Sequence, residues 1–247
     1  ILSLLGALTY AELGCLRVGT GGLYAYIRDA FGPAAAFVYG WTLFIVIASG
    51  SLATLGVAAG DNMAALIPGI TPGGKKAVAL AMLVLLAFIN ARGTRMSTRV
   101  LAGAVVLKVA ALAFLIVVLP LVGTGFSKVV TPLPTDWNGA VLAGALVAMI
   151  SVLWAYEGWQ YATFIGGEVK DPQRNFPLGL IGGTVAVIVV YVLTNIGYVA
   201  GLGPEALAGS TTVASDAVRI GIGPTAAKLI AIPVLVSIAS GAHGLML

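Results

Sequence analysis

Long uncharged apolar runs separate the charged residues of this chain. Residues 30–60, 137–156, 175–204 and 229–247 contain no Asp, Glu, Lys or Arg. A helix of about 20 mostly apolar residues crosses the hydrocarbon core of a bilayer. We therefore predict membrane spans at 33–60, 75–91, 100–122, 139–166 and 178–200, with partial spans at 1–14 and 226–247.

The runs are continuous, as in Val105–Leu119, and do not alternate between polar and apolar residues. Strands of a membrane barrel alternate over about 10 residues, so helices are predicted. The expected fold class is an all-α polytopic membrane protein, with one transmembrane domain over residues 1–247. Since the sequence begins at Ile1 and ends at Leu247 inside apolar runs, we expect it to be a fragment.

Composition narrows the class of protein. Of the 247 residues, 60% are hydrophobic and 9% are charged, whereas a soluble domain carries roughly 25% charged residues. These values exclude a soluble globular protein, a disordered chain and a nucleic-acid-binding module. The chain has one cysteine, Cys15, and one histidine, His243. No internal disulfide or His/Cys metal cluster is therefore expected, and neither a metal nor a cofactor is predicted.

Basic residues are divided unevenly between two sets of loops. One set holds seven, Arg17, Arg28, Arg92, Arg95, Arg99, Lys170 and Arg174. The other set holds five, Lys75, Lys76, Lys128, Arg219 and Lys228. Cytoplasmic loops of membrane proteins are enriched in Lys and Arg, which predicts that the first set is cytoplasmic.

Glu157 falls near the middle of the predicted span 139–166. An ionised carboxylate at that depth is costly unless it faces water or a partner. Gly158 follows it, and aromatic residues flank the pair, so we predict that the helix breaks near 154–159. A broken helix frees carbonyl and N–H groups that can bind a polar solute. The residues alone leave open an intact helix whose Glu157 is paired inside the bundle.

Lys108 is the second charge inside a span. A buried ammonium must be neutral, hydrated or hydrogen-bonded, and in transporters a lysine can take the place of a bound metal ion. The alternative is that its long side chain reaches the cytoplasmic interface. Small residues and two hydroxyls, Ser237 and Ser240, occur in the last span, where they suit close helix packing or a polar contact.

Several motifs together resemble one family. Ala7–Gly14 and Gly21–Ile27 are similar to the end of its second helix and the following loop. Trp154–Trp159 resembles its sixth helix at the unwound point, Glu168–Pro177 the next loop, and Ser237–Gly244 the eighth helix. The family is the L-type amino acid transporter branch of the amino acid–polyamine–organocation superfamily, and the resemblance covers essentially the whole chain.

The resemblance implies a fold of two inverted five-helix repeats with two extra helices, of which the second to eighth helices are present. It implies a substrate site at mid-membrane between broken helices, with Trp154, Ala155, Glu157, Gly158 and Trp159 contributing to it. Trp154 would close over the substrate from outside, and carbonyls of the break would accept hydrogen bonds from the ammonium group of the substrate.

The resemblance also assigns a role to the second charge. Lys108 would stand in for a sodium ion, and Ser237 or Ser240 would be its partner on the eighth helix. The loop Asp61–Gly74 lacks the cysteine that links animal relatives to a heavy chain, so no disulfide-linked partner is expected.

The expected function is sodium-independent exchange of small neutral L-amino acids by alternating access, in a multi-pass protein of the cell membrane. The expected partners are the amino acid substrate and the lipid bilayer. Proton-coupled uptake of amino acids or polyamines is the alternative, with Lys108 or Glu157 carrying the proton, or Glu157 binding a cation. We find no nucleophile elbow and no metalloprotease motif, so an enzyme with catalytic residues is not predicted.

Overall fold

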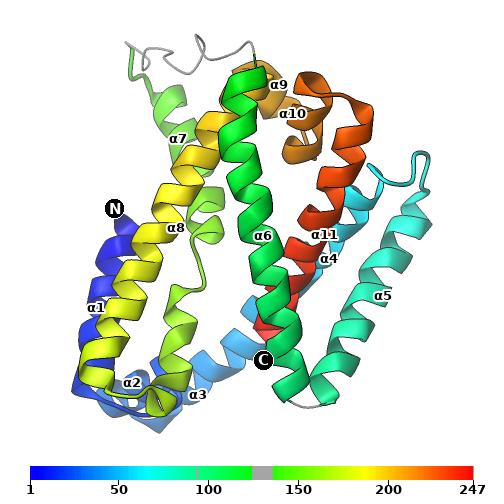
Figure 1. The fold of residues 1–247 in the computed structure, drawn as a ribbon. Coiled ribbons are helices and arrows are strands. Elements are labelled where there is room, and N and C mark those ends of the chain that lie inside the picture. Colours follow the sequence, from blue (N-terminus) through cyan, green and yellow to red (C-terminus); the bar gives the residue numbers. More distant parts are fainter. Residues whose placement is uncertain (93, 124–135, 247) are drawn as a thin grey trace. The chain divides into compact units, whose positions relative to one another are not determined.

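The computed structural model describes residues 1–92, 94–123 and 136–246, and of residues 94–100 and 165 it describes the backbone alone. Every regular element within these ranges is a helix (Figure 1). Six of the described helical segments are long and apolar enough to cross a membrane, namely Pro33–Met63, Pro72–Ala91, Leu101–Val122, Gly139–Phe164, Pro172–Leu202 and Pro224–Met246. The predicted all-α polytopic membrane fold is confirmed.

Local sequence explains where these helices begin. The helix α5 (Pro72–Ala91) starts with proline in its first turn, and Thr71 Oγ1 accepts a hydrogen bond from the Gly74 N–H at 3.1 Å. Proline suits this position because the first N–H groups of a helix have no partner within the helix. The helix α7 (Gly139–Ala155) is capped in the same way by Asn138, whose Oδ1 accepts from the Val141 N–H at 3.0 Å.

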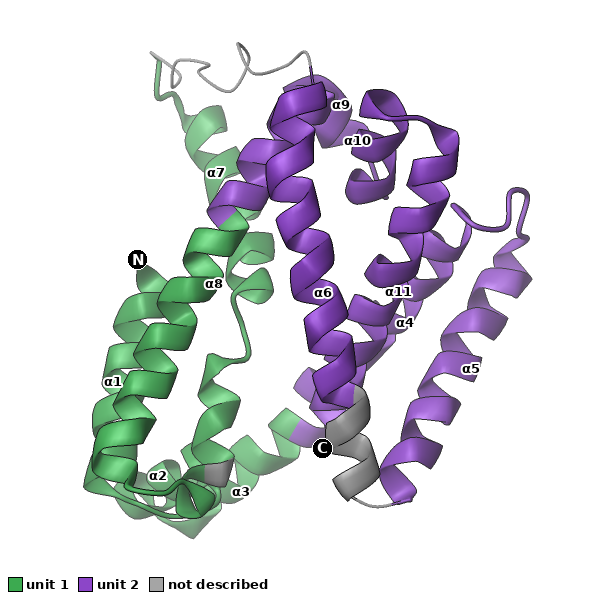
Figure 2. Cartoon of the chain, in the orientation of Figure 1, with its two compact units in different colours: residues 1–43, 132–191 green, residues 44–131, 192–247 purple. Residues whose placement is uncertain are grey.

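The chain forms two compact units, shown in green and purple in Figure 2. Unit 1 comprises residues 1–43 and 132–191, and unit 2 comprises residues 44–131 and 192–247. The chain passes from one unit to the other within helical segments, after Leu43 and after Tyr191. The single transmembrane domain and the inverted five-helix repeat stay predictions.

Unit 1 contains α1 (Leu2–Leu16), α2 (Gly22–Phe31), α3 (Pro33–Thr42), α7, the 3-10 helix η3 (Trp159–Glu168) and the first part of α8 (Pro172–Leu202). Its core is a cluster of Ala7, Ala11, Phe176 and Leu180. Glycine permits close approach here, because a Cβ at Gly6 would lie 2.6 Å from the Trp159 ring. The small face of α1 is thereby packed directly against the start of η3.

Unit 2 contains α4 (Ser49–Met63), α5, α6 (Thr94–Val122), α9 (Pro204–Gly209), α10 (Val213–Gly221) and α11 (Pro224–Met246). It also holds most of the π-helical turn η1 (Leu43–Ala48) and the end of α8. The helix α11 packs against α4, α5, α6 and α10. Leu115, Leu119, Ala217, Val218 and Ile230 form the buried core of this unit.

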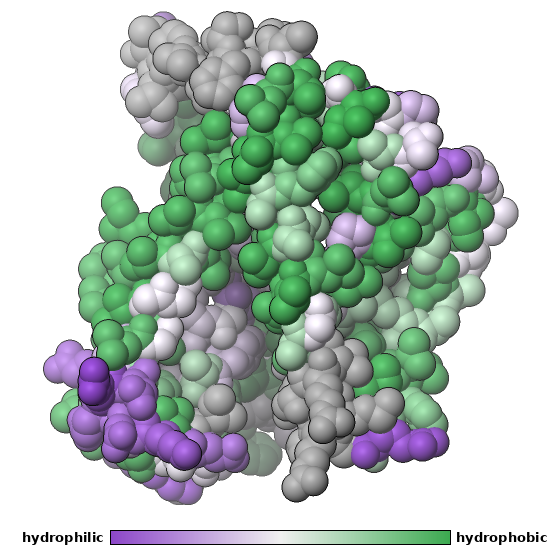
Figure 3. Space-filling model, viewed as in Figure 1, coloured by the Kyte–Doolittle hydropathy of each residue, from purple (hydrophilic) through white to green (hydrophobic). Residues whose placement is uncertain are grey.

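On the face shown in Figure 3 most of the surface is apolar (green), and hydrophilic residues (purple) gather in patches toward its edges. Val106, Ile150 and Val84 are exposed by 71%, 70% and 68%. Such side chains suit contact with lipid. Lys128 and the side chains of Arg95 and Arg99 lie outside the described residues, so the cytoplasmic assignment stays a prediction.

Candidate functional site

A turn interrupts the Gly139–Phe164 segment in unit 1. The helix α7 ends at Ala155, residues 156–158 form the turn, and η3 begins at Trp159. Gly158 has φ 125° and ψ −25°, a backbone conformation that residues with a Cβ rarely adopt. The turn lies inside the predicted break, residues 154–159, and depends on glycine at position 158.

The turn leaves peptide groups outside the helical hydrogen-bond ladder. The Tyr156 N–H donates to the Val152 carbonyl at 3.2 Å, and the Glu157 N–H donates to the Trp154 carbonyl at 3.1 Å. Within the described part of the chain, no backbone N–H donates to the carbonyls of Tyr156 or Glu157. These two carbonyls are free to accept a hydrogen bond from a solute.

Gln160 closes the turn and was missed by the sequence analysis. Its Oε1 accepts from the Gly158 N–H at 3.0 Å, while its Nε2 donates to Glu157 Oε1 at 3.2 Å. Its own carbonyl accepts from the Thr163 hydroxyl at 2.7 Å. A side-chain amide has both a donor and an acceptor, so Gln160 supports the backbone and the carboxylate together. The available signal was an amide two residues after the glycine of a predicted break.

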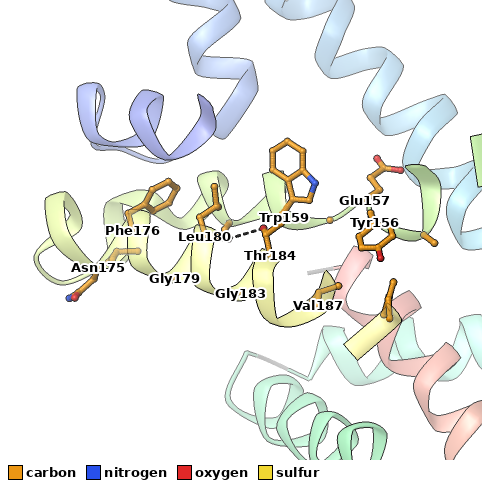
Figure 4. Close-up of a pocket in the computed structure, with 15 residues that line it drawn as sticks. Tyr156, Glu157, Trp159, Asn175, Phe176, Gly179, Leu180, Gly183, Thr184 and Val187 are labelled. Atoms are coloured by element: carbon orange, nitrogen blue, oxygen red, sulfur yellow. Dashed lines mark hydrogen bonds between the residues drawn. The ribbon is translucent and has the colours of Figure 1, made fainter. Parts of the chain in front are cut away.

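A cavity of about 460 Å³ adjoins the turn within unit 1. One wall is formed by the turn and its neighbours, and the other by a face of α8 with Gly179, Gly183 and Thr184 (Figure 4). Figure 4 shows the Tyr156 ring turned toward α8 and the Glu157 carboxylate turned away from it. The Tyr156 ring lies 5.0 Å from the ring of Tyr191, which also lines the cavity.

Four of the five predicted substrate residues, Ala155, Glu157, Gly158 and Trp159, line this cavity. Trp154 is absent from its described lining and is 45% exposed on the last turn of α7. Trp159 also has a packing role, because its ring meets that of Tyr10 edge-on at 5.1 Å. Glu157 is exposed and, among the described residues, forms no ion pair.

Lys108 lines a different cavity, of about 340 Å³, within unit 2. Ser237 lines the same cavity, so the structure brings these two predicted residues to one site. Ser240 is buried and donates its hydroxyl to the Ser237 carbonyl at 2.8 Å, and it is not among the described lining residues. Asn62, Tyr198 and Thr211 also line the cavity and were not predicted.

Lys108 has polar surroundings but no direct partner in the described part of the chain. No hydrogen bond or ion pair to its ammonium occurs there. The described lining contains hydroxyls from Tyr198, Thr211 and Ser237 and no carboxylate. An ammonium donates up to three hydrogen bonds, so a solute or water is needed to satisfy it.

Comparison with known proteins identifies relatives along the whole chain. The profile of the amino acid permease family matches residues 1–247. The chain is 33% identical to the b(0,+)-type amino acid transporter 1 of Oryctolagus cuniculus, over 87% of this chain and 45% of the relative. It is 30% identical to the serine/threonine exchanger SteT of Bacillus subtilis (strain 168), over 100% of this chain and 55% of the relative.

A third relative is the large neutral amino acids transporter small subunit 2 of Mus musculus, 30% identical over 87% of this chain and 41% of the relative. The chain thus spans about half the length of these curated relatives. Together with the apolar helices, the family match indicates a multi-pass protein of the cell membrane. The chain belongs to the amino acid permease family, in the L-type branch of the amino acid–polyamine–organocation superfamily that its motifs predicted.

Proposed function

We propose that this chain is part of a carrier that exchanges small neutral L-amino acids across the cell membrane by alternating access, without sodium. The observation that carries the proposal is the turn at residues 156–158, which interrupts an apolar span and lines a cavity of about 460 Å³. A solute in the membrane can be held by peptide groups only where the helix is interrupted. The names of relatives, a serine/threonine exchanger among them, support the same class of function.

In this proposal the carbonyls of Tyr156 and Glu157 accept hydrogen bonds from the substrate ammonium. Gly158 has open space where a side chain would stand, and Ala155 beside it is small. A substrate backbone can therefore approach the turn closely. Gln160 keeps the turn in its bound geometry by its bonds to Gly158 and Glu157, so little reorganisation is required on binding.

Lys108 supplies a fixed positive charge in place of a sodium ion. Its position in a cavity with Ser237 and Tyr198, and without a described carboxylate, supports this role. The exchange then depends on substrate alone, because the carrier changes between its outward-facing and inward-facing states only when substrate is bound. Trp154 is proposed to close over the substrate, which requires its exposed ring to move during transport.

The test is counterflow in liposomes with the purified full-length protein. Labelled L-alanine and L-serine outside should enter only when unlabelled alanine is inside, at the same rate in sodium and in choline buffer. If labelled substrate accumulates under an imposed pH gradient without internal substrate, the protein is a proton-coupled permease and not an exchanger. Absence of any flux from a folded, reconstituted sample would exclude a carrier.

Glu157 favours a second candidate, carriage of polyamines or other organic cations. Its carboxylate is exposed beside the free carbonyls and has only the Gln160 amide as a hydrogen-bond partner in the described residues. A carboxylate in a membrane site attracts a cationic group. Putrescine should then inhibit the uptake of a labelled organic cation, whereas alanine should not. Glu157→Gln should abolish the inhibition by putrescine.

A further inference from the structure

A second cavity of unit 2, of about 440 Å³, adjoins the one that contains Lys108. It is lined by one face of α4, including Thr54, Val57 and Asp61. Asn62 and Thr211 line both cavities. The two cavities therefore share two lining residues, one from α4 and one from the segment between α9 and α10, and we call this pair the junction.

The second cavity leads to a polar end of unit 2. Asp61, in its wall, pairs with Lys75 at the start of α5, with Lys75 Nζ 2.8 Å from Asp61 Oδ1. The two side chains are 39% and 38% exposed, respectively. An ion pair of this exposure is in contact with water. The Asp61 end of the second cavity is thus charged and exposed.

The residues at the junction are held in place by their neighbours. Asn62 Nδ2 donates to the Ala58 carbonyl at 2.9 Å. On either side of Thr211, the Ser210 and Thr212 hydroxyls donate to Asp216 Oδ2 at 2.7 Å and 3.2 Å. Asn62 is therefore held in place on α4, and the exposed Thr211 lies in a segment that Asp216 holds on both sides.

The far end contains the group that most needs water. Lys108 has no described hydrogen-bond partner, and an ammonium in a membrane protein is stable only when it is paired or hydrated. Hydroxyls and an amide from Tyr198, Ser237 and Asn62 supply polar lining. Both cavities are large enough for several water molecules, each of which occupies about 30 Å³ in the liquid.

We propose that the two cavities form one water-filled passage within unit 2, which connects Lys108 to the solvated Asp61 end of α4 and is bounded at its middle by Asn62 and Thr211. Water and small hydrophilic ions are its occupants. The passage goes beyond the proposed exchange function, because it defines the side of the membrane from which the Lys108 charge is solvated. The proposal of a passage is also independent of whether transport by the carrier requires exchange.

Thiol labelling tests the passage without measuring transport. Cys15 is the only cysteine of this sequence, so Cys15→Ser in a full-length chain freed of any other cysteine provides the background. Lys108→Cys and Ser237→Cys are then exposed to a membrane-impermeant cationic methanethiosulfonate on one side of sealed vesicles at a time. Lys76→Cys and Arg92→Cys, exposed at opposite ends of the span-length helix α5, mark the two sides.

Both cavity thiols should react from the Lys76 side and not from the Arg92 side. Adding Thr211→Trp should slow both reactions at least about tenfold, because the bulky ring fills the junction. Val106→Cys on the lipid-exposed face of α6, 71% exposed and outside the cavity lining, should not react from either side.

Three results would overturn the passage: reaction only from the Arg92 side, no reaction of either cavity thiol while both marker thiols react, or undiminished rates with tryptophan at 211. Two cavity positions are included so that misfolding of one variant does not remove the test. Failure of counterflow with intact labelling would refute the exchange function and leave the passage standing.

Discussion

The turn that contains Glu157 and the cavity around Lys108 differ in the groups that they offer to a solute. In unit 1 the helix is interrupted, so peptide carbonyls become available. The Glu157 carboxylate there accepts a hydrogen bond from Gln160. In unit 2, Lys108 lies within α6, where the helical backbone is internally bonded and only side chains remain for chemistry. A charge inside a span can thus mark either a backbone site or a side-chain site.

The largest effect is expected from removing the glycine on which the first site depends. Gly158→Ala must place a Cβ at φ 125°, which costs about 1–3 kcal/mol of backbone strain. We expect the turn to change shape and counterflow of labelled alanine to fall at least about tenfold.

Gly144→Ala is the matched control for that variant. Gly144 lies inside α7 with open space at its Cβ position and without a positive φ. Alanine favours a helix interior over glycine, so this variant should keep full counterflow. Equal activity of the Gly158→Ala and Gly144→Ala carriers would remove the basis for a backbone site.

The second prediction breaks the side-chain site. Lys108→Ala removes the positive charge from the cavity shared with Ser237 and should lower counterflow about tenfold, with a changed range of substrates. Lys76→Ala, which removes an exposed lysine near the start of α5, is the control and should have no effect. An unchanged rate and substrate range for Lys108→Ala would show that this lysine has no part in coupling.

Many features of the two sites could be predicted from the sequence, because the sequence signals for them are local. Only helices and closed barrels satisfy the peptide groups of a chain inside a bilayer, and continuous apolar runs of span length lack the alternation of barrel strands, so the helices could be predicted. Glu157 next to Gly158 predicted an interruption, since a carboxylate and a flexible residue at mid-span both disfavour an intact lipid-facing helix. The resemblance to the family also predicted Lys108 and its partner, Ser237 or Ser240, and Ser237 lines the Lys108 cavity.

The remainder depends on geometry that no local pattern encodes. The hydrogen bonds of Gln160 require the exact dihedral angles of Gly158. Asn62 and Thr211 come from elements separated by more than half of the chain and meet only in the packed unit. The sequence gives no sign that Trp154 and Trp159 differ in role. The turn between them leaves Trp154 exposed on α7, whereas Trp159 packs against Tyr10.

The third prediction concerns the support of the turn. Gln160→Leu keeps much of the side-chain volume but removes the acceptor of the Gly158 N–H and the donor to Glu157. A lost hydrogen bond of this kind costs about 1 kcal/mol, so counterflow should fall about fivefold. Ser151→Ala, an exposed position on α7, is the control and should retain activity. Wild-type rates for Gln160→Leu would show that the turn holds its shape without the amide.

The smallest effect is expected in unit 2, where Asp216 holds the segment around Thr211. Burial by itself would raise the pKa of Asp216, but hydrogen bonds from Ser210, Arg219 and Thr212, and the charge of Arg219, outweigh it and lower the pKa below its ordinary value of 3.8. A carboxyl group whose pKa is depressed on folding contributes stability above its unfolded pKa, and that contribution is lost as the pH falls through the folded value.

Asp216→Asn should therefore lower the Tm of the purified full-length protein at pH 7 by about 1–3 °C. The difference from the unmodified protein should narrow as the pH falls below the ordinary carboxyl pKa of 3.8 and through the lower pKa of Asp216 in the folded protein, where the native carboxyl becomes protonated. Glu205→Gln on α9, an exposed acidic residue without a described ion pair, is the control and should leave the Tm unchanged. A Tm difference for Asp216→Asn that is independent of pH would mean that side-chain shape, and not charge, orders the segment that borders the Lys108 cavity.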